Sequence, residues 1–415
     1  MVEQTKVPQI RFKWFSDEWE EKIFGDLLPI TSAARVHKNE WTKFGVPFFR
    51  SSDVVANYKG NENAKAFISF ELYKELTGKI GRVEKGDILV TGGGSIGIPY
   101  LVNSDDPLYF KDADLLWLKV RENTNSHYLY TYFSSQLFRR YLKSISHIGT
   151  IAHYTVEQAK STPIGIPGNI DEQFKIGTYF QKLGEMIELH QRKHEKLVTL
   201  KKAMLKQMFP QNGATTPEIR FKGFPEPWVE KKLGECAKFS KGQGYSKGDL
   251  VVSGSPIVLY GRLYTNYQTE ISEVDTFVLE KIGSVRSTGK EVIVPSSGET
   301  AEDIARASAI VKAGLLLGGD LNIILPASNI DSCFLALTIS NGTPRKNLER
   351  RAQGKTVVHI RNSDLEAVEV RYPLMEEQKK IGTYFRQLEE LIEQHGTQLT
   401  KLKQIKNASL EKMFV

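Results

Sequence analysis

The sequence has almost no cysteine and no long apolar run. Only Cys236 and Cys333 occur among 415 residues, which excludes a disulfide framework, and neither stands at a metal-ligand spacing. Residues 1–6 lack the apolar core of a signal peptide, and no apolar run approaches the length of a membrane span. We therefore expect a cytoplasmic protein with no membrane partner.

A recognisable catalytic constellation is also missing. Residues 92–97 have the G-x-G-x-x-G spacing of a dinucleotide-binding loop, but a strand-like segment follows them where that site needs a helix. Residues 283–290 resemble a phosphate loop only loosely, because Glu291 stands where Ser or Thr should bind magnesium. The eight histidines are scattered, and Ser297 lacks the flanking glycines of a nucleophile elbow. These absences favour a binding protein over an enzyme, with no metal or cofactor of its own.

The composition is that of a folded protein with excess positive charge. Hydrophobic residues make up 40% of the chain and charged residues 25%, so a long disordered stretch is not expected. At 415 residues the chain suits two domains. The net charge of +7 would attract a polyanion, although an anionic membrane surface or simple solubility would explain it too.

The most informative feature present is a duplication. The segment Ile176-Gly177-Thr178-Tyr179-Phe180 returns 205 positions later as Ile381-Gly382-Thr383-Tyr384-Phe385. An Arg-Phe-Lys opening followed by a Trp, at Arg11 and Trp19, returns 209 positions later at Arg220 and Trp228. Two landmarks at nearly the same offset indicate that a whole unit is repeated, so the chain has two similar working surfaces. Duplex DNA is the most obvious asymmetric partner for such a pair.

Each repeat reads as a mixed α/β domain followed by one long helix. Short β-branched and aromatic runs bounded by Gly, Ser, Asn and Pro predict strands. Residues 128–142 predict one helix ending with Arg139-Arg140, and the matching helix at 333–348 is expected to be shorter or displaced, because Gly342 and Pro344 interrupt it. We predict four segments: a first mixed α/β domain at 1–166, a first long helix at 167–212, a second mixed α/β domain at 213–372 and a second long helix at 373–415.

Apolar residues recur on one face of both long helical patterns. Their spacings of three, four and seven predict amphipathic helices, and about 35 residues at 1.5 Å each give roughly 50 Å. A helix of that length needs a partner stripe, and the other copy is the natural candidate. We therefore expect an antiparallel coiled-coil spacer that holds the two domains apart. The stripe consists of Ile176, Phe180, Leu183, Ile187, Leu197, Leu200, Leu205 and Met208, matched by Ile381, Phe385, Leu388, Ile392, Leu402, Ile405, Leu410 and Met413.

The repeated motifs resemble one known family. Each long helix begins as Pro followed by an acidic-acidic-Gln-x-Lys-Ile-Gly motif, with Glu172-Gln173 in the first copy and Glu377-Gln378 in the second. These motifs, the Arg-Phe openings, and the segments 149–153 and 355–359 before each helix are similar to those of type I restriction–modification specificity subunits. The similarity covers the whole chain in the family's order of domain, helix, domain, helix.

The resemblance implies a function and a set of partners. Such subunits are non-catalytic: two target-recognition domains each read one half of a split site in double-stranded DNA. Their antiparallel helices set the unread spacing and bind two modification subunits, which carry S-adenosylmethionine and methylate adenine. Motor/nuclease subunits, which use ATP and Mg, can join to form the restriction enzyme. The shared helices would then seat two identical partners, while the reading surfaces diverge to suit two different half-sites.

Loops offer the candidate DNA-contacting residues, because base edges are read by polar side chains and phosphates by basic ones. In the first domain the loop 31–39, the segment after the strand 46–49 and the glycine loop 92–95 are chosen, and in the second the loop 241–247 with two later turns. The candidates are Arg35, Lys38, Arg50, Ser51, Ser52, Gly93 and Ser95, and then Lys241, Gln243, Tyr245, Lys247, Arg262, Ser296 and Ser297. The pair Arg139-Arg140 fits an exposed helix face and a phosphate clamp equally well.

Two other functions stay open at this point. A bivalent DNA-binding regulator would bind DNA tightly and specifically without modification subunits. A scaffold with protein-binding helices would have no salt-sensitive affinity for DNA.

Overall fold

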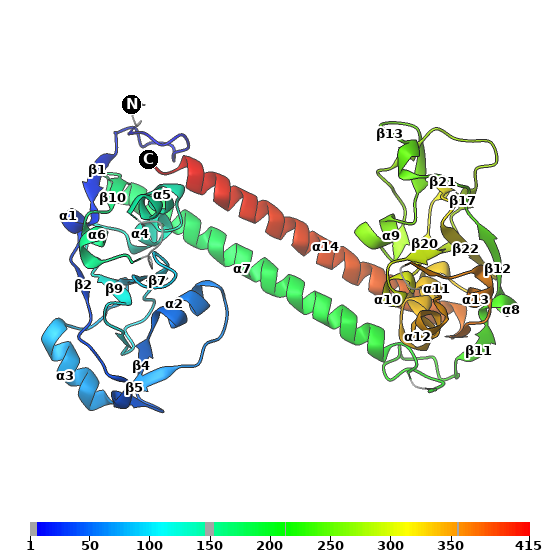
Figure 1. Ribbon diagram of the computed structural model, residues 1–415, viewed down its shortest axis with the longest axis horizontal. Helices are drawn as coiled ribbons and strands as arrows, with labels where there is room; N and C mark the ends of the chain where they lie inside the picture. Colours follow the sequence, from blue (N-terminus) through cyan, green and yellow to red (C-terminus); the bar gives the residue numbers. More distant parts are fainter. Residues whose placement is uncertain (1–5, 146–152, 212, 355–356) are drawn as a thin grey trace. The chain divides into compact units, whose positions relative to one another are not determined.

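The structure is a computed structural model of the whole chain, and it describes all residues except 1–5, 146–152, 212 and 355–356 (Figure 1). The chain forms two compact units: unit 1 comprises residues 1–190 and 397–415, and unit 2 comprises residues 191–396. Helices α7 (Ile170–Gln207) and α14 (Met375–Lys412) each contribute one part to each unit. Within the described residues, none of the helices combines the length and apolarity needed to cross a membrane.

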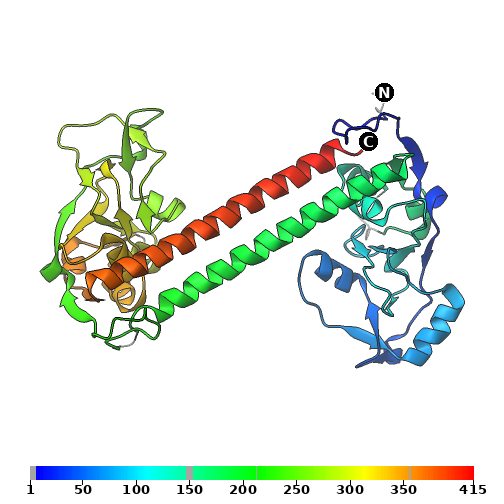
Figure 2. The same cartoon turned by 180° about the vertical axis from the view of Figure 1, so that it is seen from behind.

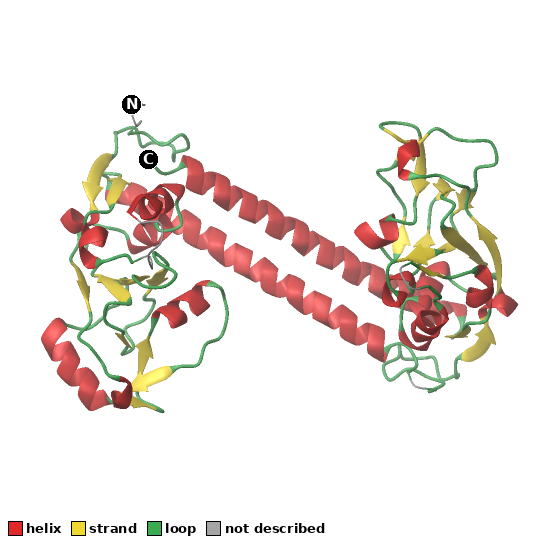
Figure 3. Ribbon diagram, viewed as in Figure 1, coloured by secondary structure: helices red, strands yellow, loops and turns green. Residues whose placement is uncertain are grey.

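Unit 1 has a mixed α/β recognition domain with two small sheets (Figure 3). One sheet has the order β2 (Ile30–Ser32), β9 (Leu115–Leu118), β6 (Ile88–Thr91) and β7 (Pro99–Leu101), with antiparallel neighbours throughout. The other has the order β3 (Trp41–Thr42), β5 (Ala66–Ile68), β4 (Val46–Phe49) and β8 (Tyr109–Phe110). A separate ribbon pairs β1 (Glu20–Ile23) with β10 (Pro163–Ile166). The helical elements are α1 (Phe24–Leu27), η1 (Lys38–Glu40), α2 (Ser51–Tyr58), α3 (Phe70–Ile80), α4 (Ser126–Tyr132), α5 (Gln136–Ile145) and α6 (Val156–Lys160).

Unit 2 has the same plan, with one more strand in each of its two sheets. Its first sheet has the order β12 (Ala237–Lys241), β22 (Leu321–Pro326), β18 (Val292–Pro295), β20 (Ser308–Ile310) and β15 (Glu270–Ile271). Its second has the order β13 (Leu250–Val251), β16 (Phe277–Val278), β14 (Ser255–Val258), β21 (Ala313–Leu317) and β17 (Arg286–Thr288). Two ribbons pair β11 (Val229–Lys232) with β24 (Glu369–Tyr372) and β19 (Ser297–Gly298) with β23 (Val358–His359). The remaining helical elements are α8 (Leu233–Cys236), η2 (Lys247–Asp249), α9 (Arg262–Thr265), α10 (Ala301–Ile304), α11 (Ser332–Ile339), α12 (Gly342–Arg351) and α13 (Asn362–Glu366).

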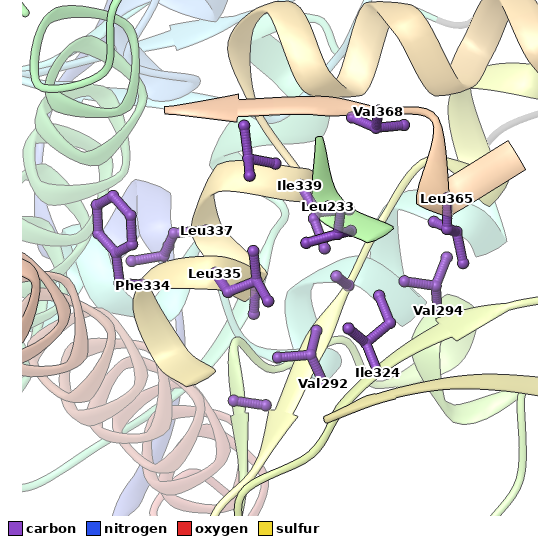
Figure 4. Close-up of a cluster of buried hydrophobic side chains, with 14 of the residues drawn as sticks. Leu233, Val292, Val294, Ile324, Phe334, Leu335, Leu337, Ile339, Leu365 and Val368 are labelled. Atoms are coloured by element: carbon purple, nitrogen blue, oxygen red, sulfur yellow. The ribbon is translucent and has the colours of Figure 1, made fainter. Parts of the chain in front are cut away.

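The core of unit 2 lies between its first sheet and helix α11. Figure 4 shows Val292, Val294 and Ile324 from the sheet facing Leu335 and Ile339 from the helix, and all of these side chains are buried. Helix α11 is apolar on every side, as expected for a helix enclosed by its own domain. The continuous apolar runs of the central strands fit the same enclosure, because a strand covered on both faces needs no polar alternation.

The predicted single helix over 128–142 is wrong, because the segment forms two helices. Helix α4 ends at Tyr132, and α5 starts afresh at Gln136. Ser135 accepts a hydrogen bond from the Phe138 amide at 3.2 Å and so caps the new helix. Unit 2 has the same break between α11 and α12, so its helices are neither shortened nor displaced relative to unit 1.

Helices α7 and α14 lie side by side in both views (Figures 1 and 2) and pack antiparallel within each unit. In unit 1 the Tyr179 hydroxyl lies 3.0 Å from the Ser409 hydroxyl. In unit 2 Lys201 Nζ lies 2.6 Å from Glu389 Oε1. Residues near the start of one helix therefore contact residues near the end of the other, as an antiparallel pair requires.

Most positions of the predicted stripe are buried. Buried members are Ile176, Phe180, Leu183, Leu402, Leu410, Met413, Met208, Ile381, Phe385 and Leu388, whereas Ile187, Leu197, Leu205 and Ile392 are half-buried. Leu200 and Ile405 were wrongly placed in the seam, since 41% and 47% of their surfaces are exposed. A two-helix pair can enclose only a narrow seam, so residues at the edge of a broad stripe remain in solvent.

The two landmarks of the duplication are partners in the fold. Arg11 of the first opening forms a two-pronged ion pair with Glu172 at the start of α7, with distances of 2.6 and 2.8 Å. Arg220 and Glu377 form the same pair at the start of α14, with both distances 2.8 Å. The neighbouring Gln173 and Gln378 donate to the carbonyls of Pro167 and Pro373. The repeated Glu-Gln motif therefore anchors each long helix to the opening of its own recognition domain.

The end of each helix completes the core of the unit in which the other helix begins. Phe209, just after α7, stacks on Phe334 with ring centroids 5.7 Å apart and also contacts Phe385 of α14. Phe414, just after α14, contacts Phe180 of α7 and the ring of Trp19. Each unit is therefore built from one recognition domain, the start of one long helix and the end of the other.

Candidate nucleic-acid interface

Two polar turns meet at one end of the first sheet of unit 1. The Gly92 amide donates to the Asp114 carbonyl at 2.8 Å, which joins the glycine turn 92–95 to the turn 111–114. We call these two turns the first turn cluster. The carbonyl of Asp114 also accepts from the hydroxyl of Ser51 at 2.8 Å, and Arg35 Nε lies 3.0 Å from Asp112 Oδ2. The structure thus brings together four of the predicted residues, namely Arg35, Ser51, Gly93 and Ser95.

The turn 111–114 is held in a specific shape. Ala113 has a φ of 59°, in the left-handed region that side chains other than glycine rarely adopt. Its amide donates to the Ser32 hydroxyl at 3.1 Å, and Lys111 pairs with Asp114 at 2.6 Å. Close packing also explains Gly92, where an added Cβ would lie 2.7 Å from the Tyr154 carbonyl. The cluster therefore presents exposed Ser95 and partly exposed Lys111 on a fixed backbone.

Arg50 directly precedes α2, and Ser52 lies in its first turn. Arg50 pairs with both oxygens of Asp53 at 2.7 and 2.9 Å and also donates to the Ala64 carbonyl. The hydrogen bond to Asp53 raises the pKa of Arg50, which keeps the guanidinium charged. Ser52 accepts from Asn63 at 3.1 Å. Both predicted residues therefore hold the loop 59–65 against α2, and Lys38 lies exposed in η1.

Unit 2 has the corresponding cluster in the same place. The Ser296 amide donates to the Asp320 carbonyl at 2.9 Å, as Gly92 does to Asp114 in unit 1. We call residues 296–298 and 318–320 the second turn cluster. Gln243 bridges to Gly318, and the hydroxyl of Tyr264 donates to the Ser297 carbonyl at 2.7 Å. A Cβ on Gly242 would lie 2.0 Å from the Gly318 carbonyl, so the backbones approach each other closely.

Among the other predicted residues of unit 2, Lys241 directly precedes Gly242 and so lies beside this cluster. Lys241 is exposed at the end of β12, and Lys247 is exposed in η2. Tyr245 accepts from the Lys281 amide at 2.8 Å, and Lys281 pairs with Asp249. That hydrogen bond from Lys281, together with those from Ser246, lowers the pKa of Asp249 to about 2. Tyr245 is thus part of an internal loop contact.

Arg262 is used within the domain. Its guanidinium binds Asp275 Oδ1 at 2.8 Å, Gln268 Oε1 at 3.0 Å and the Glu273 carbonyl at 3.2 Å, and only 12% of the side chain is exposed. A direct contact from Arg262 to a base would need these bonds to break. The residue remains a predicted DNA contact, but its visible role is to hold the segment 268–275.

Three features of the candidate interface were missed from the sequence. Asp114 and Asp320 act through their carbonyls, which no side-chain pattern reveals. The loop 59–65 is exposed at every residue and borders a cavity of about 620 Å³ lined by Asn57, Asn61 and Lys65 among others. Its run of Asn and Lys between a helix and a strand is the signal that could have identified it.

Metal or thiol chemistry finds no support in the part of the chain that the structure describes. Within these residues, His, Cys, Asp and Glu side chains are not gathered in groups that could hold a metal ion. Cys236 and Cys333 are both buried and free, and burial raises the pKa of each thiol. Both are therefore protonated near neutral pH and poor nucleophiles.

Comparison with known proteins identifies the family. The family model described as "Type I restriction modification DNA specificity domain" matches twice, at residues 16–199 and 225–404. The type I restriction enzyme MjaIX specificity subunit of Methanocaldococcus jannaschii is 22% identical over 97% of both chains. A putative type I restriction enzyme specificity subunit of Haemophilus influenzae, S.HindORF215P, is 28% identical over 169 residues, which span only 40% of each chain.

A solved structure has the same fold. The S subunit of a type I restriction–modification system from M. genitalium superimposes with a TM-score of 0.62 over 99% of both chains, at 15% sequence identity. The double match of the family model covers most of the chain, including most of each recognition domain and most of each long helix. The chain therefore belongs to the family of type I restriction–modification DNA specificity subunits.

Proposed function

We propose that this subunit reads a split, asymmetric site in double-stranded DNA, with one half-site for each unit. The observation that carries the proposal is the pair of turn clusters. Their backbones match, since Gly92 and Asp114 pair as Ser296 and Asp320 do. Their side chains differ, because the first cluster contains a Lys-Asp-Ala-Asp turn where the second has Gly-Gly-Asp. A shared scaffold with different polar groups suits two different base sequences.

Charge supports the DNA partner. The chain has a net charge of +7, and exposed lysines stand at equivalent places before the second sheet of each unit, Lys38 in η1 and Lys247 in η2. Phosphate contacts from such residues position a protein on the duplex without reading its sequence. The basic pairs Arg139-Arg140 and Arg345-Lys346 stand at equivalent places on α5 and α12 and are further candidates.

The exposed apolar residues of the long helices support the docking of two modification subunits. Met186, Leu189 and Val198 of α7 and Leu391 of α14 are each 44–47% exposed. Exposed apolar side chains that gather into a large patch mark protein interaction sites. S-adenosylmethionine would then bind to the modification subunits, and ATP and Mg to motor/nuclease subunits, while this chain catalyses nothing. It would be a cytoplasmic protein. The alternative is a stand-alone bivalent DNA-binding regulator.

The test is a methylome. The chain would be expressed with a modification subunit in a methylation-free host, and modified adenines would be read by single-molecule sequencing. A split motif that disappears without this chain supports the proposal and supplies the target sequence. The absence of any motif, with a soluble and expressed modification subunit, would contradict it. Salt-dependent DNA binding by the chain alone would then favour the regulator.

The role of the helices is tested separately by Leu183→Pro. Leu183 is buried in α7, and proline removes a helix hydrogen bond and kinks the helix. We expect this variant to lose assembly with the modification subunits in size-exclusion chromatography. A variant that still forms the full complex would contradict the docking role.

A further inference from the structure

Unit 2 contains an edge segment that unit 1 lacks among its described residues. Residues 266–273 run along the first sheet, where β15 pairs in parallel with β20. The Ala309 amide donates to the Thr269 carbonyl at 2.8 Å, and the Val311 amide donates to the Ile271 carbonyl at 3.1 Å. In unit 1 the corresponding sheet ends at β7. There the chain between α2 and β5 instead forms the exposed loop 59–65.

Glu389 of α14 ties this segment to the helix pair. Its Oε1 accepts from the hydroxyl of Thr269 at 2.5 Å and from Lys201 Nζ of α7 at 2.6 Å. Lys201 and Glu389 are only 23% and 25% exposed. One carboxylate oxygen therefore joins three elements: both long helices and the sheet edge of the recognition domain. Arg386, one turn earlier, lies 3.6 Å from Glu270 on the same edge.

The connection continues from the edge segment to the second turn cluster. Arg262 binds Gln268 and the Glu273 carbonyl, so the segment is tied to helix α9. Tyr264 of α9 donates to the Ser297 carbonyl in the cluster. A continuous series of hydrogen bonds and short chain segments thus leads from Glu389 on the long helix to the candidate DNA-reading turn.

The duplication provides an internal comparison. At the offset of 205 positions, Glu389 corresponds to Gly184, and Lys201 corresponds to Lys406. Gly184 has no side chain, and an added Cβ there would meet no atom within 4 Å. The helix position that carries the tether in unit 2 is therefore open space in unit 1.

We propose that Glu389 is a positioning residue that fixes the second turn cluster on the helix pair, and so sharpens the reading of one half-site only. The proposal rests on the proposed split-site function. A recognition domain held at its sheet edge has fewer orientations available, so a mismatched base cannot be accommodated by a small rotation of the domain. Unit 1 has no such restraint at Gly184, and its discrimination depends on its own turn cluster.

The experiment uses the complex of this chain with its modification subunits. Initial methylation rates are measured on the cognate duplex and on duplexes with single base substitutions in either half-site. Gln243→Ala identifies the half-site that unit 2 reads, because Gln243 belongs with the second turn cluster. The variants are Glu389→Ala and Thr269→Val, with Lys406→Ala as the matched control in unit 1.

We expect Glu389→Ala to reduce discrimination against substitutions in the unit 2 half-site roughly tenfold, the value of one charge-assisted hydrogen bond. Discrimination at the other half-site should be unchanged, and Thr269→Val should show the same asymmetry. Lys406→Ala should alter neither. Glu389→Gln keeps an acceptor oxygen for Thr269, so its loss should be smaller than that of Glu389→Ala. Equal loss at both half-sites, no loss, or equal effects of Gln and Ala would each overturn the proposal.

A second measurement separates the tether from the function. Hydrogen exchange of the intact chain should show faster exchange at the Ala309 and Val311 amides in Glu389→Ala, with β6 and β7 of unit 1 unaffected. Unchanged exchange would overturn the tether even if methylation changed. If wild-type complexes showed no split-site methylation, the proposed function would fail, and the exchange result would still decide the tether.

Discussion

The ion pair between Arg220 and Glu377 gives the sharpest stability prediction, because its carboxylate is fully enclosed. Glu377 has 0% exposure, and Arg220 reaches it with two nitrogens, each 2.8 Å from a carboxylate oxygen. Arg220→Met removes the cation and leaves the buried carboxylate uncompensated. Breaking a buried pair in this way costs about 3–5 kcal/mol. For a unit of this size that corresponds to a fall in melting temperature of roughly 6–20 °C.

A double-mutant cycle distinguishes the pair from its separate residues. Glu377→Met alone should also destabilise unit 2, because it strands the guanidinium. The double variant Arg220→Met/Glu377→Met replaces both charges with apolar groups and should recover most of the loss, with a coupling energy of at least about 2 kcal/mol. Hydrogen exchange at the buried strand β18 reports the unfolding of unit 2 in the full chain.

Unit 1 provides the matched control for this cycle. Arg11→Met should destabilise unit 1 and leave β18 unchanged, because Arg11 pairs with Glu172 of that unit. A loss below about 1 kcal/mol for Arg220→Met would contradict the buried ion pair, as would a double variant whose loss equals the sum of the single losses.

Three further predictions follow from single positions. Gly177→Ala should cost about 1–3 kcal/mol, because its Cβ would lie 2.4 Å from Asn125 Oδ1; Gly382→Ala, with its nearest contact at 3.4 Å, should be tolerated in the same thermal melts. Burial raises the pKa of the Asp87 carboxyl in the folded protein. The neutral carboxyl therefore stabilises the fold fully at low pH, and this stabilisation is lost as pH rises through the raised pKa. The difference in unfolding free energy between wild type and Asp87→Asn should therefore fall as pH rises above about 4, and a rising difference would contradict the assignment. Arg50→Ala and Arg262→Ala should each impair methylation at one half-site only, and equal loss at both half-sites in a base-substitution series would contradict the two-domain assignment.

Much of the architecture could be predicted because it depends on local sequence patterns. The long helices follow from apolar spacing, and the duplication follows from motifs that recur at nearly constant offsets. What the patterns could not supply was pairing across the chain. Arg11 and Glu172 were both visible as landmarks, yet 161 positions separate them. Leu200 and Ile405 continue the apolar spacing, but exposure depends on how much surface one neighbouring helix can cover.

The sequence predicts which loops form the candidate interface better than it predicts what each residue does there. Gly93 and Ser51 do converge, because strand ends bring their turns together. Arg262 looked like a free basic residue, but three acceptors more than five positions away in the chain enclose it. Asp114 was not among the candidates, because its contribution is made by a backbone carbonyl.

The placement of Phe414 in the core of unit 1 has a consequence for synthesis of the chain. Unit 2 is continuous in sequence, whereas unit 1 needs residues 397–415 as well as residues 1–190. At a translation rate of about 5–20 residues per second, the interval between the emergence of these two parts is on the order of 10–40 s. Throughout that interval Trp19 and Phe180 lack the ring that covers them in the finished fold. The amino-terminal half of the nascent chain is therefore expected to mature last, and to be the half that chaperones hold longest.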